Sequence, residues 1–286
     1  MDLFSNSLEE SPLDDVKQHL TQLDGLRETA ASAVRNAIDY TLNGSNTGRY
    51  SVEELNKTEK TLVGVLFESQ MRREFGFPDG ETSDIAIAGH DVEVKFSLNE
   101  FGWMFGPENF GELCLVAFAS EADEVYRFGL IRPVEDYLRS GINRDKKAQL
   151  LAEDRDKIDW IIEAGDLPRN ILYHMNPEKR DAIMSVEKGT PRIRKLFELH
   201  QCEIIDHTCI RTVGYDLSDP IRRVRRGSSS ARSHVKKQSL VLLGSDGSKE
   251  EAHALGYEIG KEQYVCVPEK EFHEKDVGLP DWYKEN

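Results

Sequence analysis

Acidic and basic side chains alternate with apolar ones over two short β-like runs between Asp84 and Lys95. The first run carries a single acid, Asp84, and the second carries Glu93 and Lys95. A further carboxylate, Glu68, lies sixteen residues before Asp84 in a segment with helical character. Carboxylate oxygens bind divalent cations, which polarise a phosphate and activate water, and a neighbouring lysine can orient that water or offset charge in the transition state. These four residues indicate metal-dependent phosphodiester hydrolysis.

The phase of the two runs determines whether these charges converge. Successive side chains of a strand point to opposite faces. In the run 83–88 the two isoleucines share one face and Asp84 takes the other. In the run 91–97 the apolar residues share one face, and Glu93 and Lys95 take the opposite one. The pattern therefore predicts a hairpin with an apolar side and a charged side, since a shift of one residue would bury the charges.

The surrounding elements alternate between helices and strands. Apolar spacing predicts a helix from Asp14 to about Leu42, and Ser51 with Glu54 forms a capping box that begins a helix of some twenty residues. Further elements are expected as a hairpin turn at Gly89-His90, strands at 112–120 and 125–131, and helices at 134–140 and 147–164. This order predicts an α/β domain with a mixed sheet flanked by helices.

The character of the chain changes near residue 165. Short helices with a basic bias are predicted at about 177–186, 191–200 and 206–215, and a strand at 238–244. Three small helices with a strand pair are typical of a winged helix-turn-helix module. We therefore expect two domains, one of residues 1–165 and a smaller one of residues 166–286.

Composition excludes several classes of protein. Charged residues make up 31% of the 286 residues, and no apolar run approaches the length of a membrane span. The first residues do not resemble a signal peptide, so the cytoplasm is the expected location. The pairs His200-x-Cys202 and His207-x-Cys209 lie within ten residues, but their spacing favours chance clustering over a zinc site.

The distribution of charge separates the two halves. Residues 1–166 contain 17 basic and 33 acidic residues, a net charge of −16, whereas residues 191–240 contain 11 basic and 5 acidic residues, a net charge of +6. We call residues 191–240 the basic island, and it indicates an anion-binding surface. Trp103 follows the second run, where it either contacts DNA or anchors its loop. The DNA-binding candidates are Trp103, Arg211, Arg222, Arg223, Arg225, Arg226, Arg232, Lys236 and Lys237.

Several segments together resemble a known family. They are Leu66-Phe-Glu68, Asp84–Gly89, Val92–Ser97 and Gly102–Met104 in the first half, and Asn170–Leu172, Ile210–Val213, Ile221–Arg225, Ala231–Ser233 and Leu240–Gly244 in the second. They resemble the PD-(D/E)xK nucleases and, within them, the NaeI-type restriction endonucleases. The resemblance covers most of the chain, and the spacing is kept across both halves.

The resemblance implies a function and an active site. Glu68, Asp84, Glu93 and Lys95 fall on the active-site positions, with the first three as metal ligands, although Glu93 stands where the family is expected to have Asp. The family implies a Mg²⁺-dependent type II endonuclease and a homodimer that cuts one double-stranded DNA while its C-terminal domains bind a second copy as activator. Two alternatives remain open: a modification-dependent or other nuclease of this superfamily, and a non-catalytic winged-helix regulator.

Overall fold

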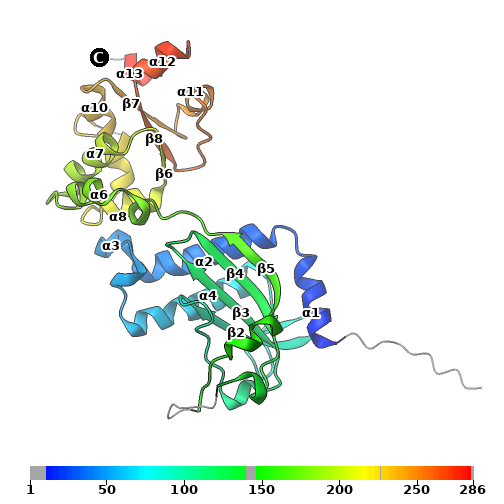
Figure 1. Ribbon diagram of the computed structural model, residues 1–286. Helices are drawn as coiled ribbons and strands as arrows, with labels where there is room; N and C mark the ends of the chain where they lie inside the picture. Colours follow the sequence, from blue (N-terminus) through cyan, green and yellow to red (C-terminus); the bar gives the residue numbers. More distant parts are fainter. Residues whose placement is uncertain (1–10, 140–145, 226, 285–286) are drawn as a thin grey trace, which may run out of the picture. The chain divides into compact units, whose positions relative to one another are not determined.

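The computed structural model describes residues 11–139, 146–225 and 227–284, which form two compact units (Figure 1). The N-terminal unit contains the described residues up to Thr41 together with Leu55–Arg169. The C-terminal unit contains Leu42–Glu54 and the residues from Asn170 onward. The segment 42–54, which the sequence pattern places in the first domain, therefore belongs to the second unit. No helix among the described residues is long and apolar enough to cross a membrane.

A five-stranded mixed sheet forms the centre of the N-terminal unit. Its strands lie in the order β1-β2-β3-β4-β5, and only β2 and β3 run parallel. The strands are β1 (Ile85–Ile87), β2 (His90–Ser97), β3 (Cys114–Ser120), β4 (Val125–Ile131) and β5 (Asp159–Asp166). Six of the seven residues of β3 are buried, which confirms the prediction of a buried central strand. The mixed α/β architecture is the one that the order of elements predicts.

Three helices pack around this sheet: α1 (Pro12–Thr21), α2 (Leu26–Leu42) and α4 (Lys57–Phe75). The helix predicted over residues 14–42 is two helices, because the chain turns at Gly25, whose φ of 67° suits glycine. The Ser51 backbone amide donates a hydrogen bond to the Glu54 carboxylate, and the Ser51 hydroxyl accepts one from the Glu53 amide, but these bonds cap only the short 3-10 turn η1 (Val52–Glu54). The long helix α4 begins at Lys57 with its own capping box and ends at Phe75.

The two helices predicted after β4 are not formed. Within 134–140, the described residues contain only the 3-10 turn η3 (Glu135–Tyr137), and residue 140 lies outside the described part of the chain. The segment 147–164 contains the 3-10 helix η4 (Ala152–Lys157) and most of the strand β5. Pairing with β4 decides this outcome, because it offers the segment backbone hydrogen bonds from a distant part of the chain that local periodicity does not report.

The C-terminal unit has a three-stranded antiparallel sheet of order β6-β8-β7, made of β6 (Ile204–Ile205), β7 (Leu240–Gly244) and β8 (Tyr264–Pro268). The predicted helices and strand are found as α6 (Pro177–Met184), α7 (Gly189–Leu199), α8 (His207–Val213) and β7. The remaining helices are α3 (Gly44–Thr47), α5 (Ile171–His174), α9 (Pro220–Arg225), α10 (Ala231–Lys236), α11 (Lys249–Ala254), α12 (Lys270–Glu274) and α13 (Asp281–Lys284). Leu240 and Leu242 face one apolar core, and Val241 and Leu243 face another on the opposite side of the sheet.

The segment 42–54 packs on α8 within the C-terminal unit. A Cβ atom added at Gly44 would lie 2.4 Å from Thr212 Oγ1, so only glycine allows this close approach. The carbonyl of Tyr50 accepts a hydrogen bond of 2.7 Å from the Asn170 side chain, and the Arg180 guanidinium lies over the Tyr50 ring. These contacts explain why a segment from the first half of the chain belongs to the second unit.

Candidate active site

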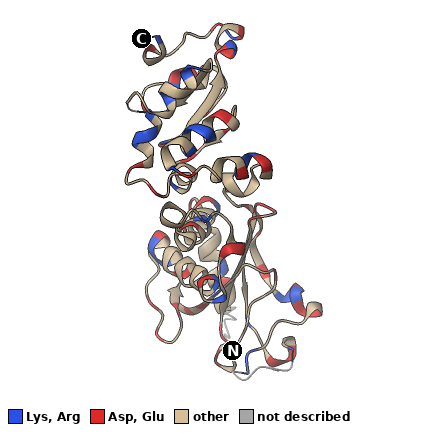
Figure 2. Ribbon diagram, turned by 90° about the vertical axis from the view of Figure 1, so that its left-hand side faces the viewer, with Lys and Arg blue, Asp and Glu red and all other residues tan. Residues whose placement is uncertain are grey.

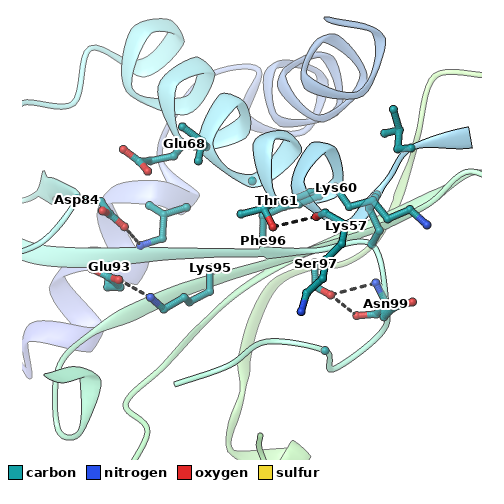
Figure 3. Close-up of a pocket in the computed structure, with 16 residues that line it drawn as sticks. Lys57, Lys60, Thr61, Glu68, Asp84, Glu93, Lys95, Phe96, Ser97 and Asn99 are labelled. Atoms are coloured by element: carbon teal, nitrogen blue, oxygen red, sulfur yellow. Dashed lines mark hydrogen bonds and ion pairs between the residues drawn. The ribbon is translucent and has the colours of Figure 1, made fainter. Parts of the chain in front are cut away.

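All four predicted site residues line one cavity of about 710 Å³ in the N-terminal unit (Figure 3). Glu68 comes from α4, Asp84 from the residue before β1, and Glu93 and Lys95 from β2. The hairpin turn that joins the strands is Ala88-Gly89, one residue earlier than predicted, and both residues have positive φ. Such a two-residue turn matches the twist of paired strands.

Strand alternation places the charges as the sequence predicts. Ile85, Ile87 and Val92 are each at most 1% exposed and face the core. Asp84 and Glu93 lie on the opposite side, where they are partly buried and border the cavity. The hairpin therefore separates an apolar face from a charged face.

Asp84 and Glu93 are each held by a specific partner. The Val94 backbone amide donates a hydrogen bond of 2.8 Å to Asp84 Oδ2. Glu93 forms an ion pair with the Lys95 ammonium, and both side chains are about four-fifths buried. Burial limits the rotamers of these groups, so the site is largely ordered before any ligand binds.

Arg72 positions Glu68 from the next turn of α4. Its guanidinium lies 2.7 Å from Glu68 and 2.5 Å from Asp79 in the loop that precedes β1. Burial raises the pKa of Glu68, the negative charge of Asp84 raises it further, and Arg72 opposes both effects. The carboxylates are therefore close enough to repel one another.

Asp91 stabilises the loop that leads into Asp84. It accepts hydrogen bonds from the backbone amides of Glu81 and Thr82 and from the Thr82 hydroxyl, at 2.7–2.8 Å. The hydrogen bond from the Thr82 side chain, followed by those from the two amides, lowers the pKa of Asp91. Although Asp91 shares strand phase with Glu93, it does not line the cavity, so its contribution is to fix the loop before Asp84.

The carboxylates suit a divalent cation in their chemistry. Among the described residues, no three His, Cys, Asp or Glu side chains are gathered closely enough to form a complete metal site. Glu68, Asp84 and Glu93 nevertheless offer oxygen donors to one cavity, and Mg²⁺ needs few protein ligands because it keeps several waters. The repulsion that raises the pKa of Glu68 is the kind that a bound cation relieves. The residues present therefore fit such an ion.

Two further lysines line this cavity and were not among the residues predicted from the sequence. Lys57 and Lys60 border the same space as Glu68, near the start of α4. The sequence contained a signal for these two lysines, because residues 57, 60 and 68 fall on one face of a helix with 3.6 residues per turn.

Trp103 is buried and anchors its loop. It is only 2% exposed, and its indole N–H donates a hydrogen bond of 2.7 Å to the carbonyl of Ala117 on β3. The ring also packs against Phe101 and Trp160 in the apolar core. Its burial and its engaged indole N–H favour the loop-anchoring alternative over contact with DNA.

Figure 2 marks the lysines and arginines of the described residues in blue on the ribbon, and those of the basic island divide into exposed and engaged residues. Arg211 on α8, Arg222 and Arg223 on α9, and Lys237 after α10 are exposed. Arg225 lies 3.5 Å from Asp246, and the Lys236 ammonium lies over the Tyr283 ring. Arg226 lies outside the described residues.

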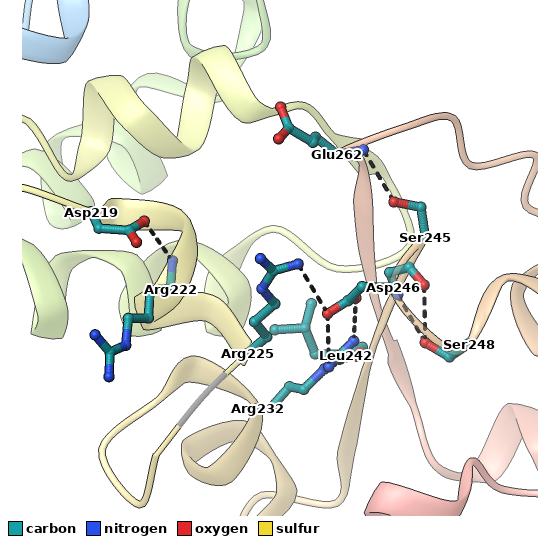
Figure 4. Close-up of polar contacts among 10 residues, drawn as sticks. Asp219, Arg222, Arg225, Arg232, Leu242, Ser245, Asp246, Ser248 and Glu262 are labelled. Carbon is teal, nitrogen blue, oxygen red and sulfur yellow. Dashed lines mark hydrogen bonds and ion pairs between the residues drawn. The ribbon is translucent and has the colours of Figure 1, made fainter.

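Arg232 is engaged inside the C-terminal unit (Figure 4). It is 9% exposed, and its guanidinium donates hydrogen bonds to the carbonyl of Leu242 and to both carboxylate oxygens of Asp246. The guanidinium also lies over the Trp282 ring. Arg232 and Lys236 belong to helix α10. The burial of Arg232 in the α10–β7 contact favours a structural role over contact with a phosphate.

Comparison with known proteins agrees with this geometry. Residues 14–271 match the family model described as restriction endonuclease NaeI. A type II restriction enzyme, NaeI from Lentzea aerocolonigenes, is 34% identical over 263 residues, which cover 89% of this chain and 82% of that protein. The range matched by the family model spans both units and contains the four predicted site residues, Glu68, Asp84, Glu93 and Lys95. The chain therefore belongs to the NaeI family of restriction endonucleases.

Proposed function

We propose that this protein is a Mg²⁺-dependent type II restriction endonuclease of the cytoplasm that hydrolyses both strands of DNA at a short palindromic site. The observation that carries the proposal is the single cavity lined by Glu68, Asp84, Glu93 and Lys95. Membership of a restriction endonuclease family supports DNA as the substrate. The glutamate at position 93 supplies the same oxygen donors as an aspartate on a longer arm.

The four residues have distinct roles in this proposal. Glu68, Asp84 and Glu93 would hold Mg²⁺, which when bound polarises the scissile phosphate and lowers the pKa of a coordinated water. Lys95, which is ion-paired with Glu93, would donate a hydrogen bond to the phosphate oxygens as negative charge develops. The hydrogen bond from the Val94 amide keeps Asp84 oriented towards the cavity.

A homodimer would present two such cavities to one DNA duplex. A two-fold axis in the protein matches the two-fold symmetry of a palindromic site, so one subunit would cut each strand.

The C-terminal unit is proposed as a winged-helix domain that binds a second DNA copy as an effector. Its order of α7, β6, α8 and later helices before β7 and β8, with sheet order β6-β8-β7, supports this proposal. The exposed cations Arg211, Arg222, Arg223 and Lys237 would contact phosphates, which receive most protein–DNA hydrogen bonds.

The first experiment incubates the purified protein with unmethylated plasmid and Mg²⁺. Discrete fragments that disappear with EDTA are expected, and sequencing their ends would identify the site. A smear would contradict site specificity, and cleavage only of modified DNA would favour a modification-dependent nuclease. No cleavage of any DNA would favour the non-catalytic regulator.

A substitution tests the role of Lys95. Lys95→Ala should abolish cleavage and leave DNA binding close to that of the wild type, because Lys95 supplies charge at the scissile phosphate, while the lost ion pair with Glu93 lowers the unfolding midpoint of a protein that still folds. Lys157→Ala is the matched control, since Lys157 is a lysine of the same unit outside the cavity. Loss of both folding and binding in Lys95→Ala would show that Lys95 is structural.

A further inference from the structure

We propose that Lys57 and Lys60 form a phosphate-binding end of the catalytic cavity, where they hold the DNA strand a few nucleotides away from the scissile phosphate. The inference rests on the proposed function and extends it to residues outside the catalytic set. Figure 3 shows both lysines at the opposite end of the cavity from Asp84 and Glu93.

One face of α4 carries both the proposed metal ligand Glu68 and the two lysines of the proposed phosphate site. Lys57 and Lys60 lie eleven and eight residues before Glu68, and helix geometry places all three on the same face. The helix rises 1.5 Å per residue, so Lys60 lies roughly 12 Å along the axis from Glu68. With one phosphate per 3.4 Å of duplex axis on each strand, this distance corresponds to about three nucleotides.

The charge of this end of the cavity differs from that of its surroundings. Residues 1–166 carry a net charge of −16, which repels DNA. The carboxylates of the cavity lining are Glu68, Asp84 and Glu93, so the wall opposite the lysines, from Phe96 to Asn99, contains no acid. A strand that enters the cavity would therefore meet two of the three lysines of its lining, Lys57 and Lys60, at this end.

Neither lysine is explained by an interaction inside the protein. Both are exposed, and no ion pair or side-chain hydrogen bond joins either ammonium to another described residue. Most other lysines of this unit are engaged, as Lys17 is with Asp159 and Lys95 with Glu93. The ammonium groups of Lys57 and Lys60 are therefore available to an external anion.

Their position is also unfavourable for the helix itself. Lys57 is the first residue of the 19-residue helix α4, and Lys60 follows in its first turns. The positive end of the helix dipole disfavours cations there and favours anions. Asn56 and Glu59 already cap this end. A bound phosphate would complement both the ammonium groups and the helix end, which accounts for two lysines at a site that stability alone would not select.

The test compares the salt dependence of DNA binding in the full-length protein, with EDTA present to prevent cleavage. The variants are Lys57→Gln with Lys60→Gln, the charge-conserving Lys57→Arg with Lys60→Arg, and the control Lys17→Gln with Lys157→Gln. Each phosphate contact contributes about 0.9 to the slope of log K against log salt. The first variant should lose about 1.8 from the slope, because two contacts are removed, and the arginine variant should keep it.

Two further measurements complete the test. The glutamine variant should keep the wild-type unfolding midpoint, and its cleavage should show a raised KM with little change in kcat. A slope equal to that of the wild type, or an equal loss in the Lys17/Lys157 control, would overturn the inference. If the wild type cuts DNA and the slope is unchanged, only this inference fails. If the wild type cuts no DNA but the slope falls in the glutamine variant, the phosphate site is supported and the proposed function fails.

Discussion

Arg232 should stabilise the C-terminal unit without binding DNA. Its guanidinium bonds to the Leu242 carbonyl at 3.3 Å and to Asp246 at 2.8 and 3.3 Å, and it lies 5.0 Å from the centre of the Trp282 ring. The contacts join α10 to the end of β7. Arg232→Ala removes all of them and leaves the Asp246 carboxylate without its main partner.

The expected loss follows from these contacts. Removing one partner of a buried ion pair costs about 3–5 kcal/mol, because the other charge stays buried. Here Arg225 remains 3.5 Å from Asp246 and can compensate in part, and the side chain of Asp246 is 22% exposed. We therefore expect a loss of roughly 2–4 kcal/mol, a large share of the 5–15 kcal/mol that stabilises a typical domain.

Urea unfolding and DNA binding separate the two possible roles of Arg232. Arg232→Ala should unfold at lower urea and, at temperatures where it stays folded, keep the wild-type slope of DNA affinity against salt. Arg222→Ala is the matched control, because Arg222 is exposed on α9 and should show the opposite pattern. Wild-type stability together with a slope reduced by about 0.9 would refute the reasoning, since it would show that Arg232 contacts a phosphate.

Three other outcomes follow from the structure. Burial would raise the pKa of Glu198, but hydrogen bonds led by that from His234 outweigh it and lower the pKa to about 2. The carboxylate therefore stabilises the fold above the ordinary glutamate pKa of 4.5, and this contribution is lost as the pH falls from about 4.5 to about 2. Glu198→Gln should lose roughly 2–3 kcal/mol of unfolding free energy in urea at pH 7. If the difference between the variant and the wild type stayed constant as the pH falls below 4.5, the lowered pKa of Glu198 would not be its cause. Trp103→Phe should lose about 1 kcal/mol of stability because one hydrogen bond is missing, and its DNA affinity should be unchanged. Weaker DNA binding by a variant of wild-type stability would instead indicate that Trp103 contacts DNA. Arg72→Ala should shift the acid limb of the pH–rate profile to higher pH, because Arg72 lowers the pKa of Glu68, and an unmoved profile would show that Glu68 does not titrate in the reaction.

The catalytic hairpin could be predicted because its information is local. Alternation with a period of two assigned the faces of β1 and β2, and the buried isoleucines agree with it. The turn was misplaced by one residue, since positive φ at Ala88 is not visible in a pattern of apolar residues. The error did not alter which side chains face the cavity.

Long-range contacts decided the features that were missed. Residues 159–164 of the segment 147–164 form part of strand β5 because β4 pairs with them, and the segment 42–54 belongs to the C-terminal unit because it packs on α8. Arg232 is buried and Arg222 is exposed, although both belong to the basic island in the sequence. Neither the pairing partner nor the depth of a side chain follows from neighbouring residues.

The sequence by itself determined the acids, the lysine and their common strand face, and it carried the family resemblance. These depend on residue types and on a two-residue period that any strand must obey. Only the tertiary structure decided which cations remain free. It paired Arg232 with Asp246, buried Trp103 and left Lys57 and Lys60 exposed in the cavity that the carboxylates line. The physical reason is that the internal partner of a charge and its depth below the surface depend on long-range contacts, which residue type and local spacing do not report.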